Sequence, residues 1–149
     1  MLTIPHDRHQ VDLGKTLNDG EFGKVLNYEY EKWLGYNTDM QALLYFGKPV
    51  APNTLTVNCL KWVGRNVFLP AEIQVWGGDD NAHLRLIGTL KTPEPKKNDS
   101  TLITGLVCKL TPGRPVSCIK LAVKPAKIPP WSRYKGKSGW VFADEVLLN

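Results

Sequence analysis

Two pairs of side chains in the sequence have the chemistry that catalysis or metal binding requires. Asp144 and Glu145 are adjacent carboxylates, and His6 and His9 form an H-x-x-H pair. A glycosidase needs two carboxylates that flank one glycosidic bond, whereas neighbouring residues on a strand point to opposite faces. The histidine pair lies near the N-terminus and lacks a third ligand at the spacing of a zinc site. We therefore expect neither pair to be catalytic.

The sequence also lacks the motifs of other enzyme classes. It contains no G-x-S-x-G elbow, no phosphate-binding loop and no Cys/His nucleophile arrangement. Its three cysteines, Cys59, Cys108 and Cys118, show no C-x-x-C spacing. Cys59 and Cys118 lie in strand-like runs, where a buried thiol behaves as a small apolar group. A bridge between Cys108 and Cys118 stays open as an alternative, because the two residues flank an apparent hairpin. The prediction is that this chain alone is not an enzyme.

Charge is distributed unevenly along the chain. The net charge is +5, and segment 100–143 contains eight Lys and Arg residues but no Asp or Glu. One interpretation is a surface for an anionic polysaccharide or for lipid headgroups. The other, which we favour because no nucleic-acid motif accompanies the charge, is a solvated face whose lysines guard strand edges. No apolar run approaches the roughly 18 residues of a membrane-spanning helix, and residues 1–10 lack the apolar core of a secretory signal. We expect no nucleic-acid partner and no membrane span.

Alternation of apolar and polar residues is the main structural signal. Apolar residues recur at every second position in four short runs, which is typical of strands with one buried face. These positions are Met40, Ala42, Leu44 and Phe46; Leu55, Val57 and Cys59; Ile73 and Val75; and Ile119, Leu121 and Val123. Residues typical of turns separate the runs at 47–49, 77–81, 92–95 and 111–115. Short strands with Pro- and Gly-rich connections predict one all-β domain, an antiparallel β-sandwich of the jelly-roll type.

Five segments, taken in order, resemble a known family. They are LNDG at 17–20, KWLGY at 32–36, MQALLYFG at 40–47, FLPAEIQVWGGD at 68–79 and WVFADEV at 140–146. This order is similar to that of the coagulation factor five/eight type C (discoidin) superfamily of galactose-binding-like domains. With Pro130 and Trp131 included, the sequence most resembles the C-terminal modules of bacterial (Bacteroidetes) β-hexosaminidases, or chitobiases. The resemblance implies a lead-in over 1–16 and a discoidin-like module over 17–149.

The resemblance implies a structural calcium site where the N-terminal loop meets the last strand. Calcium binds six to eight oxygens, which combine carboxylates with backbone carbonyls. Asp19 and Glu145 would supply carboxylates here, and Leu17 and Asp144 would supply backbone carbonyls. Two alternatives need no metal: Asp19 only closes an Asn-Asp-Gly turn, and Glu145 points outward from a strand.

The resemblance also implies carbohydrate binding. Aromatic rings can pack against the apolar face of a sugar while a few hydrogen bonds fix its hydroxyl groups. Trp131 lies in a loop whose prolines would hold it outward, and Arg133 and Tyr134 beside it could bond hydroxyls or a carboxylate. Arg65 and Trp62, in a second loop, are further candidates.

The expected function is that of a non-catalytic carbohydrate-binding module. It would target an attached, covalently linked glycoside hydrolase of the β-hexosaminidase/chitobiase type to glycans with galactose or N-acetylhexosamine units. The alternative is a structural accessory domain that packs on the catalytic domain without binding sugar, and an exposed apolar patch around Trp131, Ile128 and Pro129 would favour it. In either case the chain is expected to be a fragment of a glycoside hydrolase that is periplasmic, on the cell surface or secreted.

Overall fold

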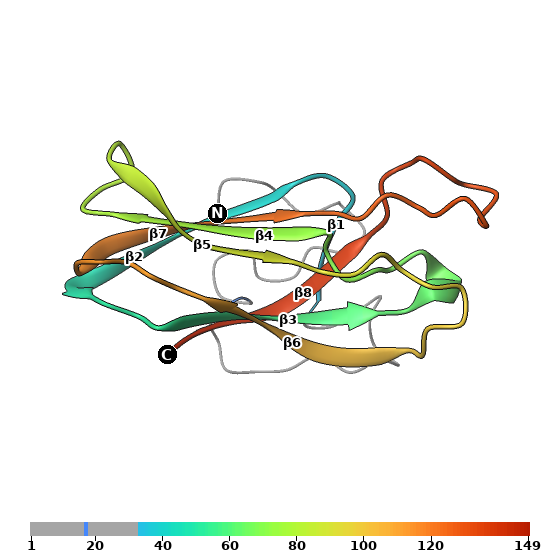
Figure 1. Ribbon diagram of the computed structural model, residues 1–149, viewed down its shortest axis with the longest axis horizontal. Coiled ribbons are helices and arrows are strands. Elements are labelled where there is room, and N and C mark those ends of the chain that lie inside the picture. Colours follow the sequence, from blue (N-terminus) through green and yellow to red (C-terminus); the bar gives the residue numbers. More distant parts are fainter. Residues whose placement is uncertain (1–16, 18–32) are drawn as a thin grey trace.

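The computed structural model describes residues 17 and 33–149, which form eight strands (Figure 1). The strands are β1 (Leu34–Tyr36), β2 (Met40–Val50), β3 (Thr54–Lys61), β4 (Glu72–Gly78), β5 (Leu84–Lys91), β6 (Leu102–Lys109), β7 (Val116–Lys124) and β8 (Val141–Leu148). One short 3-10 turn, η3 (Val63–Arg65), follows β3. In this described part of the chain, no helix has the length and apolar character to cross a membrane.

The strands form two four-stranded sheets. One sheet has the order β1-β8-β3-β6 and the other β2-β7-β4-β5, and every pairing is antiparallel. Apart from the β4–β5 hairpin, each strand is followed along the chain by a strand of the opposite sheet. This alternation is the topology of a jelly roll, so the predicted all-β sandwich is confirmed.

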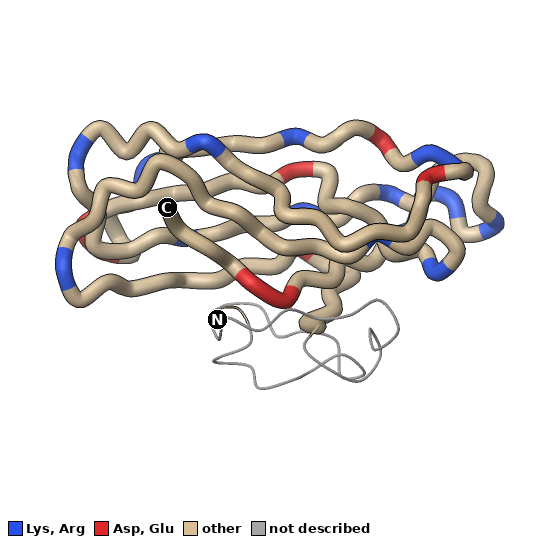
Figure 2. The backbone as a smooth tube through the Cα atoms, turned by 90° about the horizontal axis from the view of Figure 1, so that it is seen from below, with Lys and Arg blue, Asp and Glu red and all other residues tan. Residues whose placement is uncertain are grey.

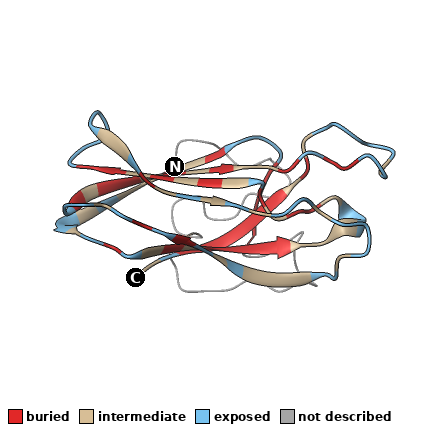
Figure 3. Cartoon of the chain, viewed as in Figure 1, coloured by how far each residue is buried: buried red, intermediate tan, exposed pale blue. Residues whose placement is uncertain are grey.

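The core lies between the two sheets, as the alternation in the sequence predicts. Leu55 and Val57 of β3 are fully buried, as are Ile73 of β4 and Leu121 of β7. Buried residues run along the central strands in Figure 3, where exposed residues gather in the connections. Each such side chain contributes about 1.5–3 kcal/mol when it is removed from water. The buried face of each strand therefore fixes its register.

The turn predicted at 47–49 is wrong, because these residues lie inside β2. β2 is an edge strand, and its pairing with β7 shifts register between Tyr45 and Val50. Proline is tolerated on edge strands and at bulges, where its missing N–H interrupts no regular ladder. Pro49 therefore marks an irregular edge and not the end of the strand.

The hairpin inferred between Cys108 and Cys118 is also wrong. These residues lie on β6 and β7, which belong to different sheets. All three cysteines are buried free thiols. Burial raises the pKa of each thiol, and the negative charge of Asp144 raises that of Cys59 further. The cysteines thus act as small core residues.

Candidate functional site

Jelly-roll connectivity brings four loops to one end of the sandwich, which we call the loop end. They are the β1–β2, β3–β4, β5–β6 and β7–β8 loops, at residues 37–39, 62–71, 92–101 and 125–140. Three of them project together at the right of Figure 1. All five predicted sugar-contacting residues lie in the β3–β4 and β7–β8 loops. The fold therefore brings both predicted groups to the same end of the molecule.

Backbone hydrogen bonds fix these two loops to each other. Trp140 N–H donates to the carbonyl of Asn66 at 2.9 Å, and Phe68 N–H donates to the carbonyl of Trp140 at 3.0 Å. Asn66 has a left-handed backbone (φ 57°), which asparagine tolerates better than most residues. Beneath the loops, Phe68 packs with Ala126 and Ile128 in a small buried cluster. The loop end is thus held by the scaffold before any ligand arrives.

Trp131 lies at the outer part of the β7–β8 loop and is 38% exposed. One edge of its ring packs on Phe68, with the ring centroids 6.5 Å apart and the planes at 74°. Ile128 and Pro129 beside it are buried. Of the three residues around which an exposed apolar patch would favour a purely structural role, Trp131, Ile128 and Pro129, only Trp131 is exposed.

The other two predicted sugar-contacting aromatics, Tyr134 and Trp62, have cations over their rings. The guanidinium of Arg133 lies 4.7 Å from the ring centroid of Tyr134, and the ammonium of Lys137 lies 5.8 Å from it. Arg65 lies similarly over Trp62, at 5.7 Å. Such cation–π contacts hold a charged group in place. They also cover ring surface that a sugar would otherwise contact.

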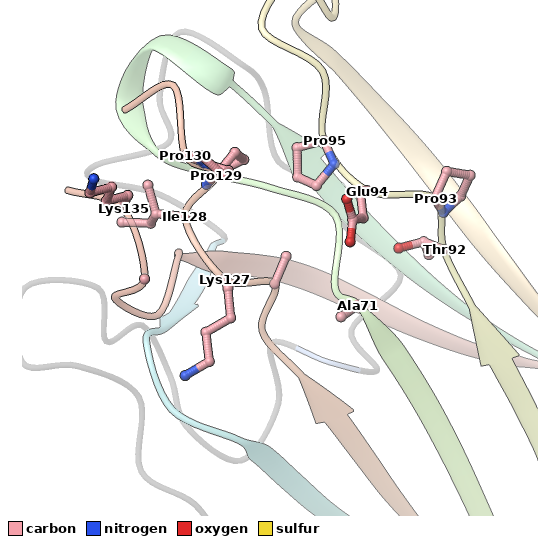
Figure 4. A pocket seen from close by; sticks show the side chains of 12 residues that line it. Ala71, Thr92, Pro93, Glu94, Pro95, Lys127, Ile128, Pro129, Pro130 and Lys135 are labelled. Carbon is pink, nitrogen blue, oxygen red and sulfur yellow. The ribbon is translucent and has the colours of Figure 1, made fainter. Parts of the chain in front are cut away.

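A cleft of about 530 Å³ opens between the β5–β6 and β7–β8 loops (Figure 4). Its walls are mostly apolar, and its polar side chains are Thr92, Glu94, Lys127 and Lys135. The apolar lining comes from Ala71, Pro93, Pro95, Ala126, Ile128, Pro129 and Pro130. Figure 4 shows Glu94 on the wall opposite Ile128, and Lys127 pointing away from Glu94.

None of the five predicted sugar-contacting residues lines this cleft. Trp131 and Arg133 belong to the same loop as its Lys127 and Lys135 but lie outside the cavity. Glu94, on the facing loop, lines the cleft but was not predicted as a site residue. Its segment, 92–95, carries only a turn signal in the sequence, because a cleft between two loops requires long-range contacts that no local pattern encodes.

The loop end is strongly basic. Its four loops contain seven Lys and Arg residues and three Asp and Glu residues. The loops of the opposite end contain one Lys or Arg residue and two Asp or Glu residues. Several of these basic residues gather at the right of Figure 2. One of the three acids, Asp99, is already paired with Lys61 of β3 at 3.7 Å. The excess positive charge is therefore a property of the loops around the cleft.

The predicted calcium ligands lie at a different place, along β8. Asp144 is fully buried, and its Oδ1 accepts a hydrogen bond from Asn58 Nδ2 at 2.8 Å. Glu145 is 2% exposed. It pairs with Asn58, so it lies on the face of the sheet opposite to the core residues Val57 and Val146. The β3–β8 register shifts at this point, which interrupts the alternation of faces and lets both carboxylates be buried.

The N-terminal half of that predicted site is described only at Leu17. Its carbonyl accepts a hydrogen bond from Val146 N–H at 2.8 Å, so Leu17 lies against β8. Asp19 and the lead-in 1–16 lie outside the described residues. Among the residues that are described, no group of three or more His, Cys, Asp and Glu side chains could hold a metal.

Comparison with known proteins adds no relative. The chain matches no protein-family model, and no curated protein matches it.

Proposed function

We propose that the chain is a non-catalytic carbohydrate-binding module whose ligand site is the loop end. The observation that carries the proposal is the cleft of about 530 Å³ beside the exposed Trp131. Ligand sites are typically clefts with apolar walls and a few polar groups that fix orientation. Here prolines and Ile128 supply the walls, and Glu94 and Lys127 supply polar groups.

The chemistry of the cleft suits a sugar ring. A pyranose has apolar C–H faces and a rim of hydroxyl groups. The proline walls can pack against such a face, and the Glu94 carboxylate can accept hydrogen bonds from hydroxyls. Trp131 adds an exposed, rigid ring for a neighbouring sugar unit. Because backbone hydrogen bonds already order the loops, binding costs little additional conformational entropy.

The ordered discoidin-like segments support the same proposal and suggest the biological setting. In that setting the module is joined to a β-hexosaminidase-like hydrolase and holds it near glycans with galactose or N-acetylhexosamine units. The protein would then work in the periplasm, at the cell surface or outside the cell.

A structural calcium ion is part of this proposal. Asp144 and Glu145 are buried carboxylates on β8, and the Leu17 carbonyl lies against the same strand. Oxygen donors of this kind are the ones that calcium prefers. With Asp19 added, they would brace the N-terminal segment against β8, away from the cleft. Calcium in this position would have no catalytic role.

Calorimetry and a glycan array with the isolated chain test the proposal. Trp131→Ala should weaken sugar binding about tenfold or more, since an aromatic residue that a ligand covers on binding contributes about 2 kcal/mol or more. Tyr45→Ala is the matched control, because Tyr45 is a 67% exposed aromatic on β2, outside the loop end. The proposal fails if no sugar binds, or if both substitutions weaken binding equally. Absence of any sugar binding would favour the structural accessory role.

A further inference from the structure

The positive charge of the β7–β8 loop has no carboxylate partner among the described residues. Ion pairs in residues 33–149 join Lys61 to Asp99, Arg114 to Asp79, Lys124 to Glu72, and His83 to Asp80. None of them involves Lys127, Arg133, Lys135 or Lys137. Four cations in a loop of sixteen residues repel one another. A ligand that brings negative charge would relieve this repulsion.

Two of these cations contact the same aromatic ring. Arg133 and Lys137 both lie over Tyr134, at 4.7 and 5.8 Å from its centroid. A neutral sugar that stacks on Tyr134 would have to displace a cation, whereas an anionic group can bind the cations where they are. Pre-ordered cations lose less side-chain entropy when they bind. The geometry therefore favours an acidic ligand over a neutral one.

The cleft can bind hydroxyl groups and an acidic group at different places. Glu94 lies on one wall, and Lys127 and Lys135 extend from the other wall in different directions (Figure 4). A carboxylate in the cavity would repel an anion placed beside it but would accept bonds from hydroxyls. A ligand with a hydroxyl-rich ring beside Glu94 and an acidic group on the lysine side of the cleft satisfies both requirements.

We infer that the loop end binds acidic glycans, meaning saccharides that bear carboxylate or sulfate groups; this inference rests on the proposed carbohydrate-binding function. Glu94 and the proline walls hold the neutral part of a sugar unit, and Lys127 and Lys135 attract acidic groups at two separate points of the opposite wall. Arg133 and Lys137 bind the acidic group of the neighbouring unit. A charged lipid surface is the less suitable ligand, because a flat headgroup layer would leave the cleft empty.

Calorimetry with four probes tests the inference: tri-galacturonic acid, neutral galactotriose, a sulfated galactotriose, and phosphatidylcholine vesicles that contain phosphatidylserine. The acidic trisaccharides should bind at least tenfold more tightly than the neutral one. The difference should shrink as the Debye length falls from about 10 Å at 0.1 M salt to about 3 Å at 1 M. Comparison of the two acidic probes shows which anionic group is preferred.

Two double variants locate the charge effect. K127Q/K135Q and R133Q/K137Q should each weaken binding of the preferred acidic trisaccharide about tenfold or more. Each should weaken galactotriose binding by a clearly smaller factor, so that the preference for the acidic trisaccharide falls. K48Q/K109Q removes the same charge from exposed sites on β2 and β6, outside the loop end. This control should change affinity less than about twofold.

Each contrary outcome has a distinct meaning. Equal binding of neutral and acidic trisaccharides overturns the inference but leaves the carbohydrate-binding function in place. An equal loss in K48Q/K109Q also overturns it, because the effect would then be one of net charge. Binding to vesicles without binding to any saccharide overturns both proposals in favour of a lipid surface, and binding to none of the four probes contradicts both as well.

Discussion

Replacing Gly139 by alanine tests whether the β7–β8 loop packs tightly against the ring of Phe68. A Cβ atom at residue 139 would lie 2.5 Å from Cδ2 of Phe68 and 3.0 Å from the carbonyl oxygen of Ala126. Phe68 is fully buried beneath Trp131, so its ring has little room to move. Overpacking of this kind costs about 1–3 kcal/mol. We expect Gly139→Ala to lower the free energy of unfolding by that amount.

A double-mutant cycle with Phe68→Ala identifies the cause. Phe68→Ala alone should cost about 3–5 kcal/mol, as truncation of a buried phenylalanine does. In that background the ring is absent, so Gly139→Ala should cost much less than it does in the natural sequence. Urea denaturation followed by tryptophan fluorescence measures each free energy. Gly47→Ala, which would meet nothing within 4 Å, is the control and should change stability by less than about 0.5 kcal/mol. Strictly additive effects of the two substitutions would refute the proposed contact.

Other predictions concern the buried groups of β3 and β8. Asn58→Leu should cost about 1–3 kcal/mol in urea denaturation, because Asp144 loses a buried hydrogen bond; an unchanged midpoint would contradict this. A thiol reagent should titrate three cysteines after unfolding and almost none before, since all three are buried and free; fewer than three would indicate a disulfide. The free energy of unfolding should fall as pH rises above about 9.0, because the unfolded Cys59 ionises there while burial and Asp144 keep its folded pKa higher. One such group contributes up to about 1.4 kcal/mol per pH unit, and Cys59→Ala should flatten that slope; parallel slopes would argue against it. Calcium should raise the Tm of the natural chain but not of Glu145→Gln, whereas an equal rise in both would place calcium elsewhere.

The sequence predicts the sandwich well, because a two-residue period is a local property of each strand. The faces marked by Val57, Val75 and Leu121 are the faces that the core buries. The turn predicted at Pro49 was wrong, because an irregular edge strand can also contain a proline. β1 was not predicted, because its three residues are too few to show alternation.

The candidate site is predictable only in part. The prolines around Trp131 correctly suggest an exposed loop tryptophan, since that inference is local. The burial of Glu145 was not predicted, because it follows from a register shift between β3 and β8. Glu94 escaped prediction for a related reason: its partner wall lies more than thirty residues away, and only the folded topology brings the two walls together.

The measurement that tests the central claim most directly is an NMR titration of the 15N-labelled chain with galactose- and N-acetylhexosamine-containing oligosaccharides. We predict saturable shift changes at the Trp131 indole and at backbone amides of 62–68, 92–97 and 126–137, with none in 79–83 or 110–115. Shift changes confined to the opposite end, or no change at saturating sugar, would contradict the proposal that the loop end binds carbohydrate.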